Sequence, residues 1–179
     1  NPWSGSMRTE SLRIHVRPAR SRDARALLAL HRAVAAEGRW IRTQRVTRSL
    51  GDVRRSARAS WTRDGAYLVA ESDGVLVGSL RIVREHQDAT VHVATFGMFV
   101  AASARGRGVG SALLAEALRW AGEVGVRKVE LSVYPDNEAA RALYARFGFV
   151  EEGRLVRHSR RSDGFVDEIL MGRWLGEDA

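Results

Sequence analysis

V-A-A-S-A-R-G-R-G-V-G-S, residues 100–111, is the stretch around which the chain is organised. It runs from the end of a predicted strand into a predicted helix, and Gly106, Gly108 and Gly110 alternate in it with larger side chains. Glycine permits positive φ and a close approach of the backbone, and the start of a helix presents unpaired N–H groups to an anion. Both properties suit a phosphate group, so we expect a pyrophosphate to bind here.

Two common phosphate-binding motifs do not fit this stretch. The third glycine of a G-x-G-x-x-G dinucleotide fingerprint would fall on Ser111 or Leu113, and no G-K-[ST] follows as it does in a P-loop. The glycines could also serve only to shape a tight turn between a strand and a helix. This stretch alone does not separate the two interpretations.

The composition excludes several classes of protein. The 179 residues include no cysteine, which excludes disulfides, thiolate zinc sites and a cysteine acyl-enzyme. The most apolar stretch falls short of the roughly 18 residues that a membrane helix needs, so we expect a cytoplasmic protein without a membrane partner. The net charge of +8 comes almost entirely from dispersed arginines, which favours a solvated surface over a nucleic-acid footprint.

A single domain is expected over residues 7–179, because no linker or composition shift divides them. Residues 1–6, N-P-W-S-G-S, precede Met7 and have neither the basic start nor the apolar run of a signal peptide. We interpret them as a cloning remnant.

Hydrophobic periodicity predicts seven strands and four helices. Strands are expected over residues 12–17, 66–71, 75–84, 89–101, 128–134, 149–156 and 165–174, with Asp-Gly hairpin turns at residues 73–74 and 163–164. Helices are expected over residues 21–37, 109–122 and 136–147, and a weaker polar helix over residues 42–60 that Gly51 could break. We therefore expect a mixed, mostly antiparallel sheet flanked by helices.

A second motif downstream favours the phosphate-binding interpretation of the glycine stretch. Arg105-x-x-Gly108-x-Gly110, followed by Asn137-x-x-Ala140-x-x-x-Tyr144-x-x-x-Gly148-Phe149, resembles the GNAT superfamily of acyl-CoA-dependent N-acyltransferases. Residues 95–153 carry most of the resemblance. It implies the α/β (α+β) GNAT fold, in which a mostly antiparallel seven-stranded sheet splays between strands 4 and 5 and about four helices flank it.

The resemblance implies an acetyl-CoA site along these motifs. The pyrophosphate would bind the backbone at the start of the helix, and the pantetheine arm would run beside the preceding strand. Asn137 would bind the arm, cap a helix, or do both. Tyr144 would protonate the departing thiolate, with a packed core tyrosine as the alternative. The expected cofactor contacts are Met98, Phe99, Val100, Arg105, Gly106, Arg107, Gly108, Val109, Gly110, Ser111, Asn137 and Tyr144.

The general base is not defined by the motifs. Many members of the family carry a glutamate where this chain has Thr95. This leaves His92, Glu37, Glu85 or a chain of water molecules to accept the proton of the amine.

The acceptor is expected between residues 37–47 and residues 157–167, which are rich in arginine. Trp40, Arg42, Arg157 and Arg160 could select a substrate that carries a carboxylate or phosphate beside its amine. Glu37, Asp167 and Glu168 could instead hold an ammonium group.

The predicted enzyme transfers an acetyl group from acetyl-CoA, without a metal, to the primary amine of a small molecule by direct attack in a ternary complex. An amino-acid-like compound, a polyamine or an antibiotic would be such an acceptor. The alternatives are a peptide or protein N-terminal or lysine acetyltransferase, and a non-catalytic CoA- or polyanion-binding module of the same fold. No nucleic-acid partner is expected, and a homodimer is left open.

Overall fold

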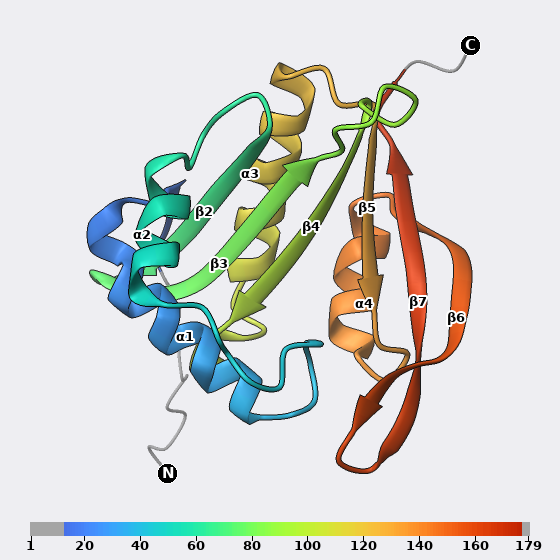
Figure 1. Ribbon diagram of the computed structural model, residues 1–179, viewed down its shortest axis with the longest axis horizontal. Helices are drawn as coiled ribbons and strands as arrows, with labels where there is room; N and C mark the ends of the chain where they lie inside the picture. The colour runs from blue at the N-terminus through green and yellow to red at the C-terminus, as the bar shows by residue number, and fades with distance from the viewer. Residues whose placement is uncertain (1–12, 177–179) are drawn as a thin grey trace, which may run out of the picture.

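The computed structural model describes residues 13–176, which form one seven-stranded sheet with helices on both faces (Figure 1). In the order β1-β2-β3-β4-β5-β7-β6, every neighbouring pair is antiparallel except β4 and β5. The strands are β1 (Ile14–Pro18), β2 (Gly65–Ser72), β3 (Val75–Arg84), β4 (Val93–Val100), β5 (Lys128–Val133), β6 (Val150–Arg161) and β7 (Gly164–Trp174). The helices are α1 (Ala24–Ala36), α2 (Leu50–Arg58), α3 (Val109–Glu123) and α4 (Glu138–Arg146), with 3-10 turns at Ser21–Asp23 and Ala102–Ala104. The expected remnant, residues 1–6, and the first residue of the predicted strand 12–17 lie outside the described residues.

Two apolar clusters cover the two faces of the sheet. The larger one packs α3, through Leu113, Leu114 and Trp120, against buried side chains of β2 to β5. The smaller one packs α1 and α2 against Tyr67 and Val69 on the opposite face. The apolar residues of α3 recur at helical spacing because they form the face that packs against the sheet.

Strands β4 and β5 pair only where they begin. Their parallel pairing runs from Val93↔Lys128 to Thr95↔Glu130. Beyond Thr95, β4 continues along β3 as far as Val100, while β5 continues along β7 as far as Val133. The two strands diverge from this point (Figure 1), which confirms the expected splay between strands 4 and 5.

The prediction for residues 42–60 was wrong about where the helix lies. Residues 42–49 are not helical, and α2 begins at Leu50 because Ser49 caps it. The Ser49 Oγ accepts a hydrogen bond from the Asp52 N–H at 3.2 Å, and the Ser49 N–H donates to Asp52 Oδ2 at 2.9 Å. Gly51 lies in the first turn of this helix and does not break it.

The predicted strand over residues 89–101 was wrong at its start. Residues 88–92 form turns, closed by backbone hydrogen bonds from Thr90 N to Gln87 O and from Val93 N to Thr90 O. Local alternation of apolar residues does not reveal such bonds. His92 therefore precedes β4.

Strand β6 bulges where it pairs with β7. Leu155 pairs with Glu168 and Ser159 with Val166, so the residues between them on β6 lie opposite Asp167 alone. In this bulge Arg157 has φ +51°, a left-handed conformation, and its N–H donates to Asp167 Oδ1 at 2.8 Å. An L-residue with a β-carbon is strained in this conformation.

Arg157→Gly is expected to raise the free energy of unfolding by about 1 kcal/mol, because glycine adopts positive φ without that strain. Chemical denaturation measures the change. Arg160→Gly is the matched control: Arg160 is another exposed arginine of β6, but it is paired with Phe165 and has no positive φ. Glycine should destabilise the protein there by about 0.5–1 kcal/mol. Changes of the same sign in both variants would contradict the prediction.

Candidate active site

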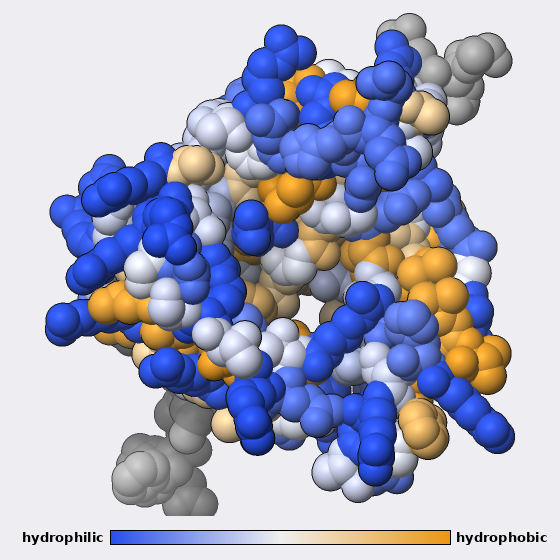
Figure 2. Space-filling view, in the orientation of Figure 1, coloured by the Kyte–Doolittle hydropathy of each residue, from blue (hydrophilic) through white to orange (hydrophobic). Residues whose placement is uncertain are grey.

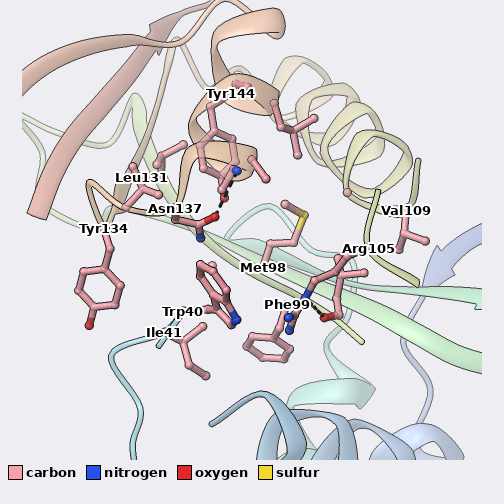
Figure 3. Close-up of a pocket in the computed structure, with 18 of the residues that line it drawn as sticks. Trp40, Ile41, Met98, Phe99, Arg105, Val109, Leu131, Tyr134, Asn137 and Tyr144 are labelled. Carbon is pink, nitrogen blue, oxygen red and sulfur yellow. Dashed lines mark hydrogen bonds between the residues drawn. The ribbon is translucent and has the colours of Figure 1, made fainter. Parts of the chain in front are cut away.

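The divergence of β4 and β5 opens a cavity of about 740 Å³. Its walls come from β4, the start of α3, the end of β5, α4, the loop between α1 and α2, and Glu168 of β7. Figure 2 shows a hollow near the centre of the molecule, with hydrophilic residues around much of its rim. Figure 3 shows Asn137 near Trp40 in the cavity, with Met98 and Phe99 beside them.

The glycine stretch lines one end of this cavity. Gly106 and Gly108 have φ of +70° and +88°, so both positions favour glycine. A β-carbon at Gly106 would meet no atom within 4 Å, and one at Gly110 would lie 2.9 Å from Leu143 Cδ2. Gly108 is the N-cap of α3, and the first N–H groups of a helix have no partner within it. Open space in front of these groups fits a pyrophosphate.

Arg105 also lines the cavity, but its guanidinium is engaged elsewhere. It donates to both oxygens of Glu37, at 2.7 and 2.6 Å, and to the Val100 carbonyl at 3.1 Å. This differs from the expected charge contact with a phosphate and leaves only the backbone of Arg105 for that role. Arg107 is exposed and does not line the cavity.

Glu37 does not line the cavity either, so the structure does not support it as a base. The hydrogen bonds from Arg105 hold the pKa of the Glu37 carboxyl below its usual value. The indole N–H of Trp40 also donates to this carboxylate, at 2.7 Å. Glu37 therefore holds Arg105 and Trp40 in place at the edge of the cavity.

Asn137 caps α4 and lines the cavity at the same time. Its Oδ1 accepts from the Ala140 N–H at 3.3 Å, which leaves the amide NH2 group as a donor. The two roles expected for Asn137 are therefore geometrically compatible.

The Tyr144 ring is 7% exposed and packs edge-on against Phe96 and Phe149, with ring centroids 5.7 and 6.0 Å apart. Burial raises the pKa of the Tyr144 hydroxyl to about 12. The residue lines the cavity, and none of residues 13–176 forms a hydrogen bond with the hydroxyl. Tyr144 is therefore a core residue whose protonated hydroxyl remains available as a donor.

The structure brings two of the four expected acceptor residues to the cavity. Trp40 and Arg42 line it, whereas Arg157 and Arg160 are exposed and do not. The Arg157 N–H is bound to Asp167, and the Arg160 carbonyl accepts a hydrogen bond from the Gln44 side chain.

The structure places His92 outside the cavity and does not support it as a base. Its ring packs edge-on against Trp174 at 6.2 Å, and its carbonyl accepts from the N–H groups of Arg127 and Lys128. It lies where β4 and β5 are still paired and does not line the cavity.

The end of the cavity near Trp40 and Arg42 also contains a carboxylate and a serine whose arrangement only the structure reveals. Glu168, one of the carboxylates expected near the acceptor, is 1% exposed and lines the cavity, where it contacts Arg42 and Ser159. Ser132, which the sequence analysis missed, also lines the cavity and accepts a hydrogen bond from Arg42 Nη2 at 2.8 Å. The alternation of β5, which buries Leu131 and Val133, is the signal that could have placed Ser132 on the other face.

Residues 36–149 match the model of the Acetyltransferase (GNAT) family. This chain belongs to that family. It is 36% identical over 107 residues to the L-amino acid N-acetyltransferase AaaT of Escherichia coli (strain K12), over 59% of this chain and 66% of that protein. The chain spans between 34% and 66% of the length of four curated relatives that it matches.

Solved structures agree with this membership. A crystal structure of a GNAT-family acetyltransferase from Streptococcus pneumoniae has a TM-score of 0.85 and 26% identity, over 91% of this chain and 99% of that one. The structure of yncA from Salmonella typhimurium with its cofactor acetyl-CoA has a TM-score of 0.84 and 20% identity, over 93% and 96% of the two chains. The fold of the present chain is therefore that of the family.

Two further properties concern residues 13–176 alone. None of their helices is both long and apolar enough to cross a bilayer. Within the same range no three His, Asp or Glu side chains are grouped so that they could hold a metal ion.

Proposed function

We propose that this chain is an acetyl-CoA-dependent N-acetyltransferase whose acceptor is the primary amine of a small molecule. One observation carries the proposal: a single cavity is lined at one end by the glycine start of α3 and at the other by Trp40, Arg42 and Glu168, with Tyr144 in its wall. Family membership supports the reaction, and the acetyl-CoA in the yncA structure supports the donor. The amino acid specificity named for AaaT supports a small acceptor.

Bound acetyl-CoA would supply the thioester that the amine attacks. The N–H groups at the start of α3 would hold its pyrophosphate, and the unpaired edge of β4 beyond Thr95 would hold its pantetheine arm. A thiol has a reference pKa of about 8.5, well below the raised pKa of Tyr144. We infer that Tyr144 donates a hydrogen bond to the developing thiolate, and that complete proton transfer to sulfur is not required.

The described residues that line the cavity offer no obvious base. Glu168 is their one carboxylate. Burial alone would raise its pKa, but hydrogen bonds from Arg42 and Ser159 lower it to about 2. Because so weak a base holds no proton near neutral pH, we propose that the amine loses its proton to water.

A loop across the cavity favours a small acceptor over a peptide. The segment 37–49 between α1 and α2 contacts β6 and β7 at three points: Arg42 binds Glu168, Gln44 binds the Arg160 carbonyl, and the Arg39 carbonyl accepts from Arg161 Nη1 at 3.2 Å. A peptide passing through the acceptor end would have to break these contacts. The single domain over residues 7–179, the cytoplasmic location and the absence of a metal remain predictions, and a homodimer remains open.

Release of CoA from acetyl-CoA, measured with a panel of small primary amines, tests the proposed function. We expect amine-dependent turnover whose kcat/KM rises about tenfold per pH unit below the pKa of the acceptor amine, because only the neutral amine attacks. His92→Ala should leave this profile unchanged. Absence of turnover with every amine would refute the function, and a pH profile that His92→Ala alters would refute the water route.

A further inference from the structure

Glu168 is a carboxylate in a place where folding alone would not require one. It lies on β7 beside the fully buried Ile169, and only 1% of its own surface is exposed. Burying a charged pair costs desolvation energy, and apolar residues of similar size often serve stability as well or better. A buried carboxylate that faces a cavity is therefore a candidate for a role in that cavity.

The contacts of Glu168 define the orientation of Arg42. Arg42 Nε lies 2.8 and 2.9 Å from the two Glu168 oxygens, and Arg42 Nη2 contacts Glu168 Oε2 and donates to Ser132 Oγ. Ser159 donates to the same carboxylate. The protein thus holds two of the three guanidinium nitrogens, Nε and Nη2. Because the guanidinium group is planar and rigid, the third nitrogen is held in a fixed direction as well.

The third guanidinium nitrogen remains available. Arg42 Nη1 has no hydrogen-bond partner among residues 13–176, and the Arg42 side chain is 56% exposed while it lines the cavity. Its two N–H groups therefore point in a direction that Glu168 and Ser132 determine. Arginine N–H groups are the preferred donors to a carboxylate.

Arginine side chains surround this end of the cavity. Arg39 and Arg161 both pair with Asp136, Arg42 pairs with Glu168, and Asp163 also interacts with Arg161. Arg161 also lies over the ring of Tyr134, which lines the cavity, with its Cζ 4.7 Å from the ring centroid. Of these three arginines only Arg42 lines the cavity, so an acceptor's carboxylate would meet its guanidinium there.

We propose that the acceptor carries a carboxylate close to its amine, as an amino acid does, that Arg42 binds this carboxylate, and that Glu168 is the positioning residue that aims Arg42. The proposal rests on the function proposed above. It assigns Glu168 a part in substrate specificity that is exerted through Arg42 and not by contact with the amine.

Other contacts hold the loop that carries Arg42. Gln44 binds the Arg160 carbonyl, and the Arg39 carbonyl accepts from Arg161. Glu168→Gln keeps the shape of the side chain but removes its charge, so it should release the guanidinium while the loop stays in place. Glu168→Gln therefore distinguishes a role of Glu168 in orienting Arg42 from a role in holding the loop.

The test compares L-amino acids with their carboxamides, which keep the amine and lose the carboxylate. For the amino acid that is turned over fastest, we expect kcat/KM to exceed that of its amide by about 10- to 100-fold, the usual effect of a charged hydrogen bond. In Arg42→Gln and in Glu168→Gln this ratio should fall toward 1 through a higher KM for the acid. The kcat and the acetyl-CoA affinity should stay unchanged, and the double variant should lose no more than either single one.

Asp167→Asn is the matched control, because Asp167 is the neighbouring carboxylate on β7 but does not line the cavity. The ratio of kcat/KM for the amino acid to that for its amide should be the same in Asp167→Asn as in the wild type. Glu168→Asp should keep part of the preference for the amino acid that Glu168→Gln loses. A wild type that uses the amide as well as the acid would overturn the inference while the proposed function stands. Equal losses on both substrates in Glu168→Gln would also overturn it.

Calorimetric titration of the wild type and Glu168→Gln with the same acid and amide gives a second readout that needs no turnover. Tighter binding of the acid, lost in Glu168→Gln, would support the carboxylate site even if no amine were acetylated, in which case only the proposed function fails. Equal affinity for the acid and the amide would refute the site.

Discussion

Gly108→Glu is expected to weaken acetyl-CoA binding by at least about 100-fold, equivalent to about 2.7 kcal/mol. Gly108 is the N-cap of α3, has φ +88°, and lines the cavity where the pyrophosphate is proposed to bind. A carboxylate there would repel the phosphates and compete for the N–H groups of the helix. Isothermal titration calorimetry measures the affinity directly.

Gly125→Glu provides a matched control for the backbone. Gly125 lies just beyond the other end of α3 and has φ +76°, and a β-carbon there would meet no atom within 4 Å. The substitution therefore introduces the same backbone strain and the same new charge, but at a residue that does not line the cavity. We expect Gly125→Glu to lose stability but to keep its acetyl-CoA affinity. Equal affinity losses in both variants would show that strain, and not the phosphate site, causes the effect.

Tyr144→Phe is expected to lower kcat by about 10²- to 10³-fold, the usual range for the loss of one hydrogen-bond donor to the charge that develops in the transition state. The phenyl ring should keep its packing against Phe96 and Phe149, so thermal stability and acetyl-CoA affinity should change little. Steady-state kinetics, calorimetry and thermal unfolding measure the three quantities. A variant with the kcat of the wild type would remove Tyr144 from the mechanism.

The raised pKa of Tyr144 also predicts the shape of the pH profile. With a folded-state pKa of about 12 against an ordinary value near 10, the hydroxyl stays protonated throughout the usual assay range. The kcat should therefore show no descending limb below about pH 10 that belongs to Tyr144. The stability that the protonated Tyr144 hydroxyl contributes to the folded state is fully present below about pH 10 and is lost as the pH rises toward 12. A descending limb near pH 8 that disappears in Tyr144→Phe would contradict this assignment.

The strands and helices were largely predictable because their signals are local. The Asp-Gly turns and the change from strand to helix period at Val109 placed most of the elements. Two errors fell where a hydrogen bond, and not periodicity, decides the conformation. Ser49 begins α2 by capping it, and the Thr90 and Val93 N–H groups close turns that leave His92 outside β4.

In the candidate site, too, the residues with a local sequence signal were predictable and the others were not. Asn137 and Tyr144 belong to one short helix and its cap, and their spacing of seven residues already indicated that they share a face. The candidates for the acceptor end do not lie on one helix or strand whose spacing would relate their positions. Four arginine and tryptophan candidates came from two segments without regular spacing, and only Trp40 and Arg42 line the cavity.

By itself, the sequence determined the half of the cavity where acetyl-CoA is proposed to bind, because the glycine turn and α4 obtain their geometry from residues next to one another in the chain. Only the tertiary structure decided the half where the acceptor is proposed to bind. Arg42 and Glu168 are 126 residues apart and meet because the loop after α1 crosses to β7. A buried carboxylate holding a loop arginine leaves no periodic signal, since its position depends on where two distant segments pack.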